Sequence, residues 1–480
     1  MQRVRSIAWA MTLVWGILPA SIPIALAQDG AAEPTDENTP PTVRLNVRPA
    51  ALPQPALKYQ LLPNIRDRRP GNAAVHYNKL GLRYPGTEPE LNLVESDWPE
   101  LSLSDLPRDE VRAFLDSHRT VLDDIDLAAR RETCDWELPI RERDFVTLLL
   151  PEAQRLRSFA RLLRLQARLQ IAEGQLDEAL HTLATGYAVG QHAARAPTLI
   201  SGLVGIAICA VMSKELEELI QQPGAPNLYW ALTALPRPLA DMQPGIEAES
   251  QMVYLSYPEL ADLENRDFGP EHWQRVLDRL LTNTARWGEG ELKQSDRLLF
   301  MARAIKGYPL AKQRLIDAGR TSDEVEAMPV AQVVAIYTMR TFDEYRDEVF
   351  KWFPLPYWQA RPGLEQANEA LKRVSSREIV PIASLILPAI SNVRMASARS
   401  ERTIAMLRVI EALRLYGAAH DGQLPAKLAD VTEVPLPVDP LTGEPFLYQL
   451  QGDTAVLEAP LPQGLIPRTI GAKFEIKFNK

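Results

Sequence analysis

The segment that decides the fold runs from Leu156 to Ala188 and reads LRSFARLLRLQARLQIAEGQLDEALHTLATGYA. Apolar residues recur in it at intervals of three and four, the spacing of one face of an α-helix. Gly174 interrupts the pattern and marks a turn. Two helices joined by so short a turn are expected to pack antiparallel. The apolar positions are Leu156, Phe159, Ala160, Leu163, Ala167 and Ile171 before the turn, and Leu176, Ala179, Leu180, Leu183, Ala184, Tyr187 and Ala188 after it.

This helical hairpin resembles one tetratricopeptide unit. The matching small and large positions are Gly174, Ala179, Leu183 and Gly186. Gln170 stands where the family has an aromatic residue, and Gln191 where it has a proline. The resemblance covers a single repeat, whereas a solenoid needs about three repeats for stability. The sequence therefore favours a hairpin within a larger helical domain.

Further helical patterns cover 197–213, 270–287, 293–305 and 329–352. The segment 197–213 is strongly apolar but shorter than the ~20 residues of a transmembrane helix. Charged residues follow it directly from Lys214, so we expect a buried core helix and no membrane span in the mature chain. The fold class predicted is mainly α, a multi-helix body of antiparallel hairpins over 57–398 with a small C-terminal α/β segment.

The C-terminal segment, residues 399–480, has a different character. A helix ends at Ala419, and two short strands, 446–450 and 454–457, are joined by Gly452-Asp453. Between the end of this helix and the first strand lie Gly422-Gln423-Leu424-Pro425 and Asp439-Pro440. This order resembles the globular domain of type II secretion major pseudopilins over roughly 399–458. The family's N-terminal leader and hydrophobic assembly helix are not matched, so the resemblance implies a shared small fold without fibre assembly.

In those pseudopilins the corresponding loop can hold calcium, which makes Asp439, Glu444 and Asp453 weak candidate ligands. Calcium takes about six to eight oxygen ligands, and these three residues do not assemble that number. The alternative is turn chemistry at Asp439-Pro440 and Thr442-Gly443. No other cofactor is predicted.

The N-terminus has the pattern of a secretory signal peptide. Arg3 and Arg5 precede an apolar run, and Ala25-Leu26-Ala27 places cleavage near Ala27. The alternative is an uncleaved anchor, because residues 7–27 carry no charge. We expect export to the periplasm or the extracellular space, with signal peptide 1–27 followed by a flexible Pro-rich leader over 28–56.

Export to an oxidising compartment permits a disulfide between Cys134 and Cys209. Cys209 lies in an apolar helical stretch, where a free buried thiol is equally natural. The sequence leaves both interpretations open.

The charge balance argues against a nucleic-acid partner. The chain has 53 Lys+Arg against 62 Asp+Glu, a net charge of −9. Losing Arg3 and Arg5 with the signal leaves 51 basic against 62 acidic residues, or −11. Such an acidic excess disfavours binding to phosphates.

No catalytic motif of the metalloprotease, P-loop, nucleophile-elbow or Cys-x-x-Cys type occurs in the sequence. The function predicted is therefore an exported helical binding or scaffold protein of the cell envelope, with an envelope protein or polymer as partner. The alternatives are an exported hydrolase whose site residues are scattered in the sequence, and an accessory protein of envelope or secretion assembly.

Overall fold

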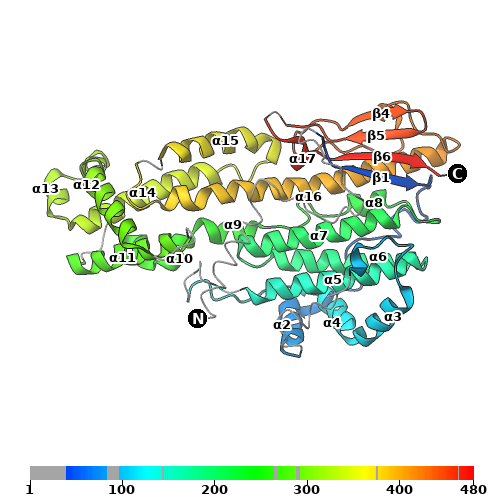
Figure 1. Cartoon of the computed structure of the whole chain (residues 1–480), viewed down its shortest axis with the longest axis horizontal. Coiled ribbons are helices and arrows are strands. Elements are labelled where there is room, and N and C mark those ends of the chain that lie inside the picture. Colours follow the sequence, from blue (N-terminus) through cyan, green and yellow to red (C-terminus); the bar gives the residue numbers. More distant parts are fainter. Residues whose placement is uncertain are drawn as a thin grey trace. The chain divides into compact units, whose positions relative to one another are not determined.

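The structure is a computed structural model that describes residues 39–83, 97–142, 145, 148, 150–263, 268–287, 292–374, 377–462 and 464–479. The predicted signal peptide, its cleavage site near Ala27 and the first part of the predicted leader lie outside the described residues. The chain is mainly α-helical and has a small α/β part at its C-terminal end, as the sequence predicted (Figure 1).

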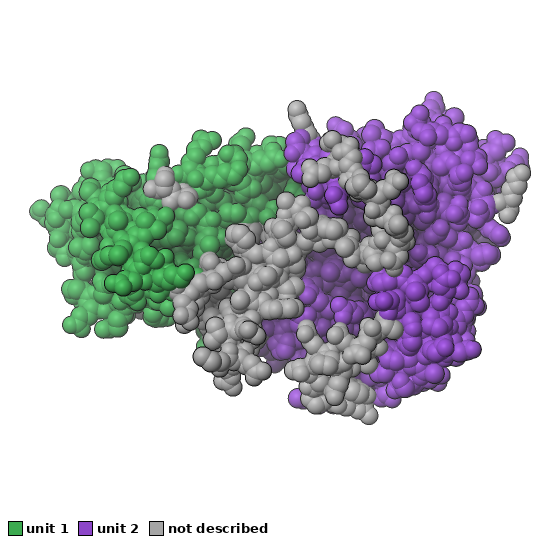
Figure 2. All heavy atoms as spheres, in the orientation of Figure 1, with its two compact units in different colours: residues 1–19, 139–148, 248–395 green, residues 20–138, 149–247, 396–480 purple. Residues whose placement is uncertain are grey.

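The chain forms two compact units, which Figure 2 shows in different colours. Among the described residues, unit 1 comprises residues from 139–148 and 248–395, and unit 2 comprises residues from 39–138, 149–247 and 396–480. The sequence-based division at 398/399 differs from this one. Residues 57–138 and 149–247 share a unit with the C-terminal segment, and helix α16 (Ile382–Ala419) runs without a break across 398/399.

Three helices form the centre of unit 2: α5 (Pro151–Ala172), α6 (Leu176–Ala194) and α7 (Leu199–Leu219). The predicted hairpin is confirmed as α5 and α6. Its turn contains Gly174 at φ +74°, a left-handed conformation that favours glycine. The Thr198 hydroxyl caps α7 by accepting from the Ser201 N–H at 3.2 Å.

Helix α7 is long and apolar enough to cross a membrane by length and composition, the one such helix in the described part of the chain. Of its most apolar 18-residue window, 67% is buried inside the protein. Cys209, Met212 and Leu216 are among its fully covered side chains. The segment 197–213 therefore contributes a core helix, as the sequence indicated.

Shorter elements surround this centre. In chain order they are β2 (Arg69–Asn72), α2 (Ala73–Arg83), η1 (Trp98–Glu100), α3 (Arg108–Ser117), α4 (Arg119–Ala129), β3 (Arg131–Thr133), α8 (Tyr229–Thr233) and α9 (Gln243–Ser250). Strands β2 and β3 pair in parallel with a register shift.

A four-stranded sheet completes unit 2, in the order β1-β6-β5-β4. Its strands are β1 (Thr42–Val47), β4 (Leu447–Gln451), β5 (Thr454–Glu458) and β6 (Lys473–Phe478), and η4 (Leu428–Asp430) and α17 (Pro467–Ile470) lie in the connections. The predicted hairpin is confirmed as β4 and β5, which pair antiparallel around Gly452. The sheet lies against the C-terminal half of α16 (Figure 1), where Phe478 fills the space that a Cβ on Gly417 would need.

The predicted flexible leader differs from the structure over Thr42–Val47, which forms strand β1. It pairs in parallel with β6, with Thr42 opposite Lys473. Leu45 and Val47 are buried, so one face of the strand contributes to the core. The sequence did not indicate this strand because three alternating apolar residues, Val43, Leu45 and Val47, are a weak signal, and the partner strand lies at the other end of the chain.

Unit 1 contains the other helices and the first part of α16. They are α10 (Met252–Ser256), η3 (Pro258–Asp262), α11 (Pro270–Trp287), α12 (Gln294–Asp317), α13 (Ser322–Ala327), α14 (Val330–Phe350) and α15 (Tyr357–Val374). The patterns at 270–287, 293–305 and 329–352 are confirmed as α11, α12 and α14. Helix α14 is the most buried of these and packs against α11, α12 and α15. Glu378 caps α16 by accepting from the Ala383 N–H at 2.8 Å.

Candidate functional site

A polar cluster around Asp126 has the arrangement closest to a catalytic one. Helices α4 and α6 pack together, and one turn of α6 directs His181 and Thr185 toward Asp126 of α4. His181 Nε2 lies 3.0 Å from Asp126 Oδ1, and the Thr185 hydroxyl donates to the same oxygen at 2.7 Å. Burial opposes ionisation of Asp126, but the hydrogen bonds from His181 and Thr185 and the charge of Arg130 hold its pKa below the usual value.

A carboxylate that orients an imidazole is the geometry of a general base. Arg130 limits this use, because its NH2 lies 2.8 Å from His181 Nε2 and its NH1 binds Asp126. Among the described residues, His181 receives no hydrogen bond from a serine or cysteine nucleophile, and the Thr185 hydroxyl donates to Asp126 and to the His181 carbonyl. The sequence did not reveal the pair because 55 residues separate its members.

A buried ion cluster joins η1, α5 and α7. Glu215 is fully buried and accepts from Arg164 Nε at 2.7 Å and from Arg168 NH1 at 3.0 Å. Arg164 also donates to Glu100 at 2.7 Å, and Arg168 donates to the Leu101 carbonyl. Two positive and two negative charges balance in this cluster. It therefore holds three elements together and leaves no net charge for a ligand.

Glu217 is the most perturbed acid of α7. Burial first, and then the charges of Glu218 and Glu215, raise its pKa from 4.5 to about 8 despite the opposing effect of Lys214. Burial and Glu215 also raise the pKa of Glu218. Glu217 thus carries a proton at neutral pH. The sequence suggested only a polar helix end after 213, because it does not show which acids become buried.

His192 lies in a buried aromatic cluster. Its Nδ1 lies 3.0 Å from the Tyr77 hydroxyl, and Trp136 stacks on Tyr77 at a ring-centroid distance of 5.7 Å. Burial, and then the charge of Arg195, lowers the pKa of His192 from 6.5 to about 3. The imidazole is therefore neutral, and its Nδ1 shares a hydrogen bond with the Tyr77 hydroxyl. This arrangement stabilises the core.

The calcium candidates do not come together around a cation. Both carboxylate oxygens of Asp439 bind Arg402, at 2.8 Å to Nε and 2.6 Å to NH2. Asp453 pairs with Lys477 at 3.3 Å on the surface, and the Glu444 side chain is exposed. The described residues contain no group of three or more His, Cys, Asp or Glu side chains that can hold a metal.

The loop instead has the turn chemistry that was the alternative. Asp439 Oδ1 accepts from the Leu441 N–H at 3.1 Å, and Asp439 Oδ2 accepts from the Thr442 hydroxyl at 3.0 Å. The buried Arg402 therefore binds the Asp439 carboxylate that the calcium interpretation required as a ligand. The sequence did not show this because Arg402 stands on α16, 37 residues earlier.

Cys134 and Cys209 are both free and buried. Of the two alternatives left open by the sequence, the structure has the buried thiols and not the disulfide. Burial raises the pKa of each thiol to about 12. Neither is therefore a reactive nucleophile.

An exposed apolar row on α12 is the feature that sequence reasoning missed. Leu298, Met301 and Ile305 are 57%, 50% and 78% exposed and recur at helical spacing on one face. We call these three residues the α12 stripe. Leu299 is also exposed, about a third of a turn around the helix from the stripe. The sequence indicated a helix here, but periodicity alone does not show which apolar face is covered.

The covered side of α12 is a different one. Gly307 lies against Ile379, and Ala311 and Leu315 are buried in the same unit. At about 100° per residue, this side lies roughly a third of a turn around the helix from the stripe. Helix α12 therefore has one apolar face for its own unit and a second that no described residue covers.

The chain matches no family model, no curated protein and no solved structure.

Proposed function

We propose that this protein is an exported, mainly helical binding protein that attaches to a component of the cell envelope through the α12 stripe. The observation that carries the proposal is the exposure of Leu298, Met301 and Ile305 in one row on a single helix. Rows of exposed apolar side chains mark interaction sites in folded proteins. The secretory pattern that ends near Ala27 supports export.

Cell fractionation tests this function. The double variant Leu298→Glu, Ile305→Glu keeps both side chains at exposed positions, so we expect it to fold. Wild-type protein is expected in the envelope fraction, and the variant in the soluble fraction. Leu298 and Ile305 would be buried against the envelope component on binding. Losing both apolar contacts predicts a decrease of at least about tenfold in the share of the protein that is bound to the envelope.

The matched control places two glutamates on unit 2. Ile65→Glu, Leu82→Glu also replaces two strongly exposed apolar residues, and it should leave the envelope-bound share unchanged. A wild-type protein that is wholly soluble, or an equal effect of both double variants, would disprove attachment through α12.

A hydrolase is the second candidate, because His181 and Asp126 have the geometry of an oriented base. The test is hydrolysis of chromogenic ester, amide and glycoside substrates by the purified protein. His181→Ala should reduce any activity by about 10²–10⁴-fold. His420→Ala is the control, since His420 is another exposed histidine near a carboxylate, 3.6 Å from Glu433. Activity that survives His181→Ala would rule out this site.

An accessory role in secretion assembly is the third candidate. Its support is the pseudopilin-like order of residues 399–458 and the edge position of β4, where Leu447 is exposed. Deleting 399–480 would not test it, since β1 would lose its partner strand. Leu447→Glu leaves the sheet in place. It should abolish co-purification of envelope proteins if this edge binds them, and unchanged co-purification would exclude the edge.

A further inference from the structure

Helix α16 carries three buried arginines in unit 2, and one of them lacks a counter-charge. Arg402, Arg408 and Arg414 are 2%, 6% and 1% exposed. Arg402 binds Asp439 at 2.6 Å, and Arg414 binds Glu411 at 2.7 Å. Arg408 forms no ion pair with any described residue. Because taking a charge out of water is costly, a buried guanidinium is expected to have a partner of opposite charge.

Two neutral hydroxyl groups of α8 hold the Arg408 guanidinium. Its Nε donates to the Thr233 hydroxyl at 2.9 Å, and its NH2 donates to the Tyr229 hydroxyl at 3.3 Å. The guanidinium carbon lies 5.4 Å from the centroid of the Tyr229 ring. Thr233 in turn donates to the Tyr229 carbonyl at 2.7 Å, and Tyr229 donates to the Pro435 carbonyl. These contacts orient the guanidinium but supply no negative charge.

The other edge of the guanidinium has no protein partner. An arginine has five N–H donors, and the two bonds to α8 leave three of them for a ligand. No described residue accepts a hydrogen bond from Arg408 NH1, and this atom is not fully covered. Thr233 is half-buried, and Ala234 and Pro435 are exposed. The open edge of Arg408 therefore lies just below the protein surface.

A second positive charge acts on Arg408. Burial lowers the pKa of Arg408 most, contacts with Tyr229 oppose this, and the charge of Arg237 lowers the pKa further. Arg237 is exposed and follows α8 by four residues. Its side chain forms no ion pair or hydrogen bond with any described residue. Two arginines thus lie close enough to repel each other, and no described acid neutralises either one.

We propose that Arg408 and Arg237 bind a phosphate group, as the free ion or as the end of a phosphate ester. The oxygens of a phosphate accept two parallel N–H bonds from the open edge of Arg408. A phosphate monoester carries nearly two negative charges at neutral pH, which balance the two arginines. The net charge of −9 disfavours a long polyanion, whereas a single phosphate responds to the local charge.

This inference goes beyond the proposed function and does not depend on it. Both arginines belong to unit 2, whereas the α12 stripe belongs to unit 1. Failure of one of the two sites would leave the other untouched.

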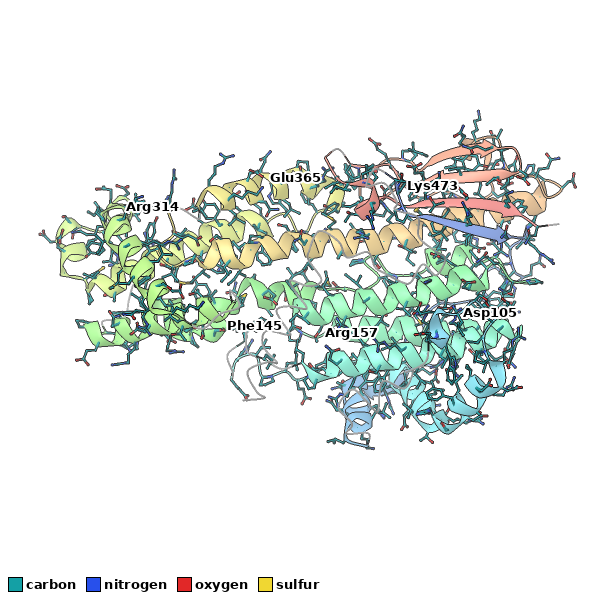
Figure 3. All side chains as sticks on the ribbon, in the orientation of Figure 1. Asp105, Phe145, Arg157, Arg314, Glu365 and Lys473 are labelled. Atoms are coloured by element: carbon teal, nitrogen blue, oxygen red, sulfur yellow. The ribbon has the colours of Figure 1, made fainter. Side chains whose placement is uncertain are left out.

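Calorimetric titration of the full-length protein with inorganic phosphate, at constant ionic strength, tests the site. Wild-type protein should bind with a Kd of about 1 mM or lower. Arg408→Met removes the charge and keeps the apolar stem, so it should fold, as circular dichroism can verify, and lose saturable binding. The matched control is Arg157→Met. Arg157, labelled in Figure 3, is a half-buried arginine of α5 in the same unit, and its loss should leave the Kd unchanged.

A second variant tests the site without altering the protein interior. Arg237→Gln changes an exposed side chain and should raise the Kd for phosphate by about fivefold or more. Arg119→Gln, at an exposed arginine of α4, is its control and should have no effect. Equal effects of these two variants would show that net charge, and not Arg237, governs the affinity.

The choice of anion is tested with the same protein. Acetate should bind much more weakly than phosphate, and equal binding would overturn the preference for a doubly charged group. Glycerol 3-phosphate distinguishes the sources: binding as tight as that of inorganic phosphate supports an ester, and weaker binding supports the free ion. No saturable binding of phosphate by wild type, or binding that survives Arg408→Met, would overturn the site.

Discussion

The guanidinium of Arg402 holds the carboxylate of Asp439 at two points, with Nε 2.8 Å from Oδ1 and NH2 2.6 Å from Oδ2. Both side chains are almost completely buried. Arg402 also donates to the carbonyls of Ile470, at 2.6 Å, and Pro460, at 3.2 Å. One arginine of α16 therefore fixes three separate parts of the C-terminal chain.

Asp439→Ala should destabilise unit 2 by about 3–5 kcal/mol, because it leaves the Arg402 charge buried without a partner. Urea denaturation followed by circular dichroism measures the loss. Arg402→Met, Asp439→Leu removes both charges together and should recover much of the stability. Asp453→Ala, at an exposed ion pair, is the control and should leave the midpoint nearly unchanged. Equal midpoints for Asp439→Ala and Asp453→Ala would contradict a buried ion pair between Arg402 and Asp439.

Glu217 should make the protein less stable as the pH rises from about 4.5 to about 8. In this window the folded protein keeps a proton, since burial raises the Glu217 pKa to about 8, while the unfolded chain has released it. The free energy of unfolding falls by up to about 1.4 kcal/mol per pH unit. Glu217→Gln removes this contribution, so its stability relative to wild type should increase between pH 5 and pH 8.

The control for losing an acid is Glu178→Gln on the exposed face of α6. Denaturation curves at several pH values give the differences. A Glu217→Gln difference that stays constant across the pH range would show that this carboxyl does not retain its proton.

Titration of His192 should change the stability in the opposite direction: the protein becomes less stable as the pH falls below 6.5. Its pKa is about 3 in the folded protein against 6.5 in the unfolded chain, because burial disfavours the cation. Below pH 6.5 the unfolded chain takes up a proton that the folded protein does not, so stability falls with acidification by up to about 1.4 kcal/mol per pH unit. His192→Gln should cost about 1–3 kcal/mol at pH 7 through the altered contact with Tyr77.

The stability gap between wild type and His192→Gln should narrow from pH 6.5 to pH 4, since the variant lacks the titrating group. His420→Gln, at an exposed histidine, serves for comparison. A gap that is independent of pH would contradict a neutral buried imidazole.

Gly205→Ala should separate α6 from α7. A Cβ at this position would lie 2.5 Å from the Gly190 carbonyl oxygen, a backbone atom that cannot rotate away. We expect a loss of about 1–3 kcal/mol in unfolding experiments. Gly269→Ala is the control, because nothing lies within 4 Å of its Cβ position. If both substitutions had the same effect, the close approach of the two helices would be wrong.

The elements formed by neighbouring residues followed from the sequence. Helices α5, α6, α11 and α14 carry apolar residues at helical spacing, and the β4–β5 hairpin has its turn at Gly452. Each depends on residues a few positions apart. Pairings between distant segments did not follow: β1 with β6, Arg402 with Asp439, and Asp126 with His181.

The sequence alone thus determined the mainly helical class and the position of the long helices, because periodicity is a local property of the chain. Only the tertiary structure decided which apolar faces are covered and which charges are buried. Leu298 and Ile305 are apolar like the core residues of α14, yet they remain exposed. Glu217 retains its proton because burial removes the water that would stabilise its charge. Burial depends on the neighbours that folding brings together, and these are far apart in the sequence.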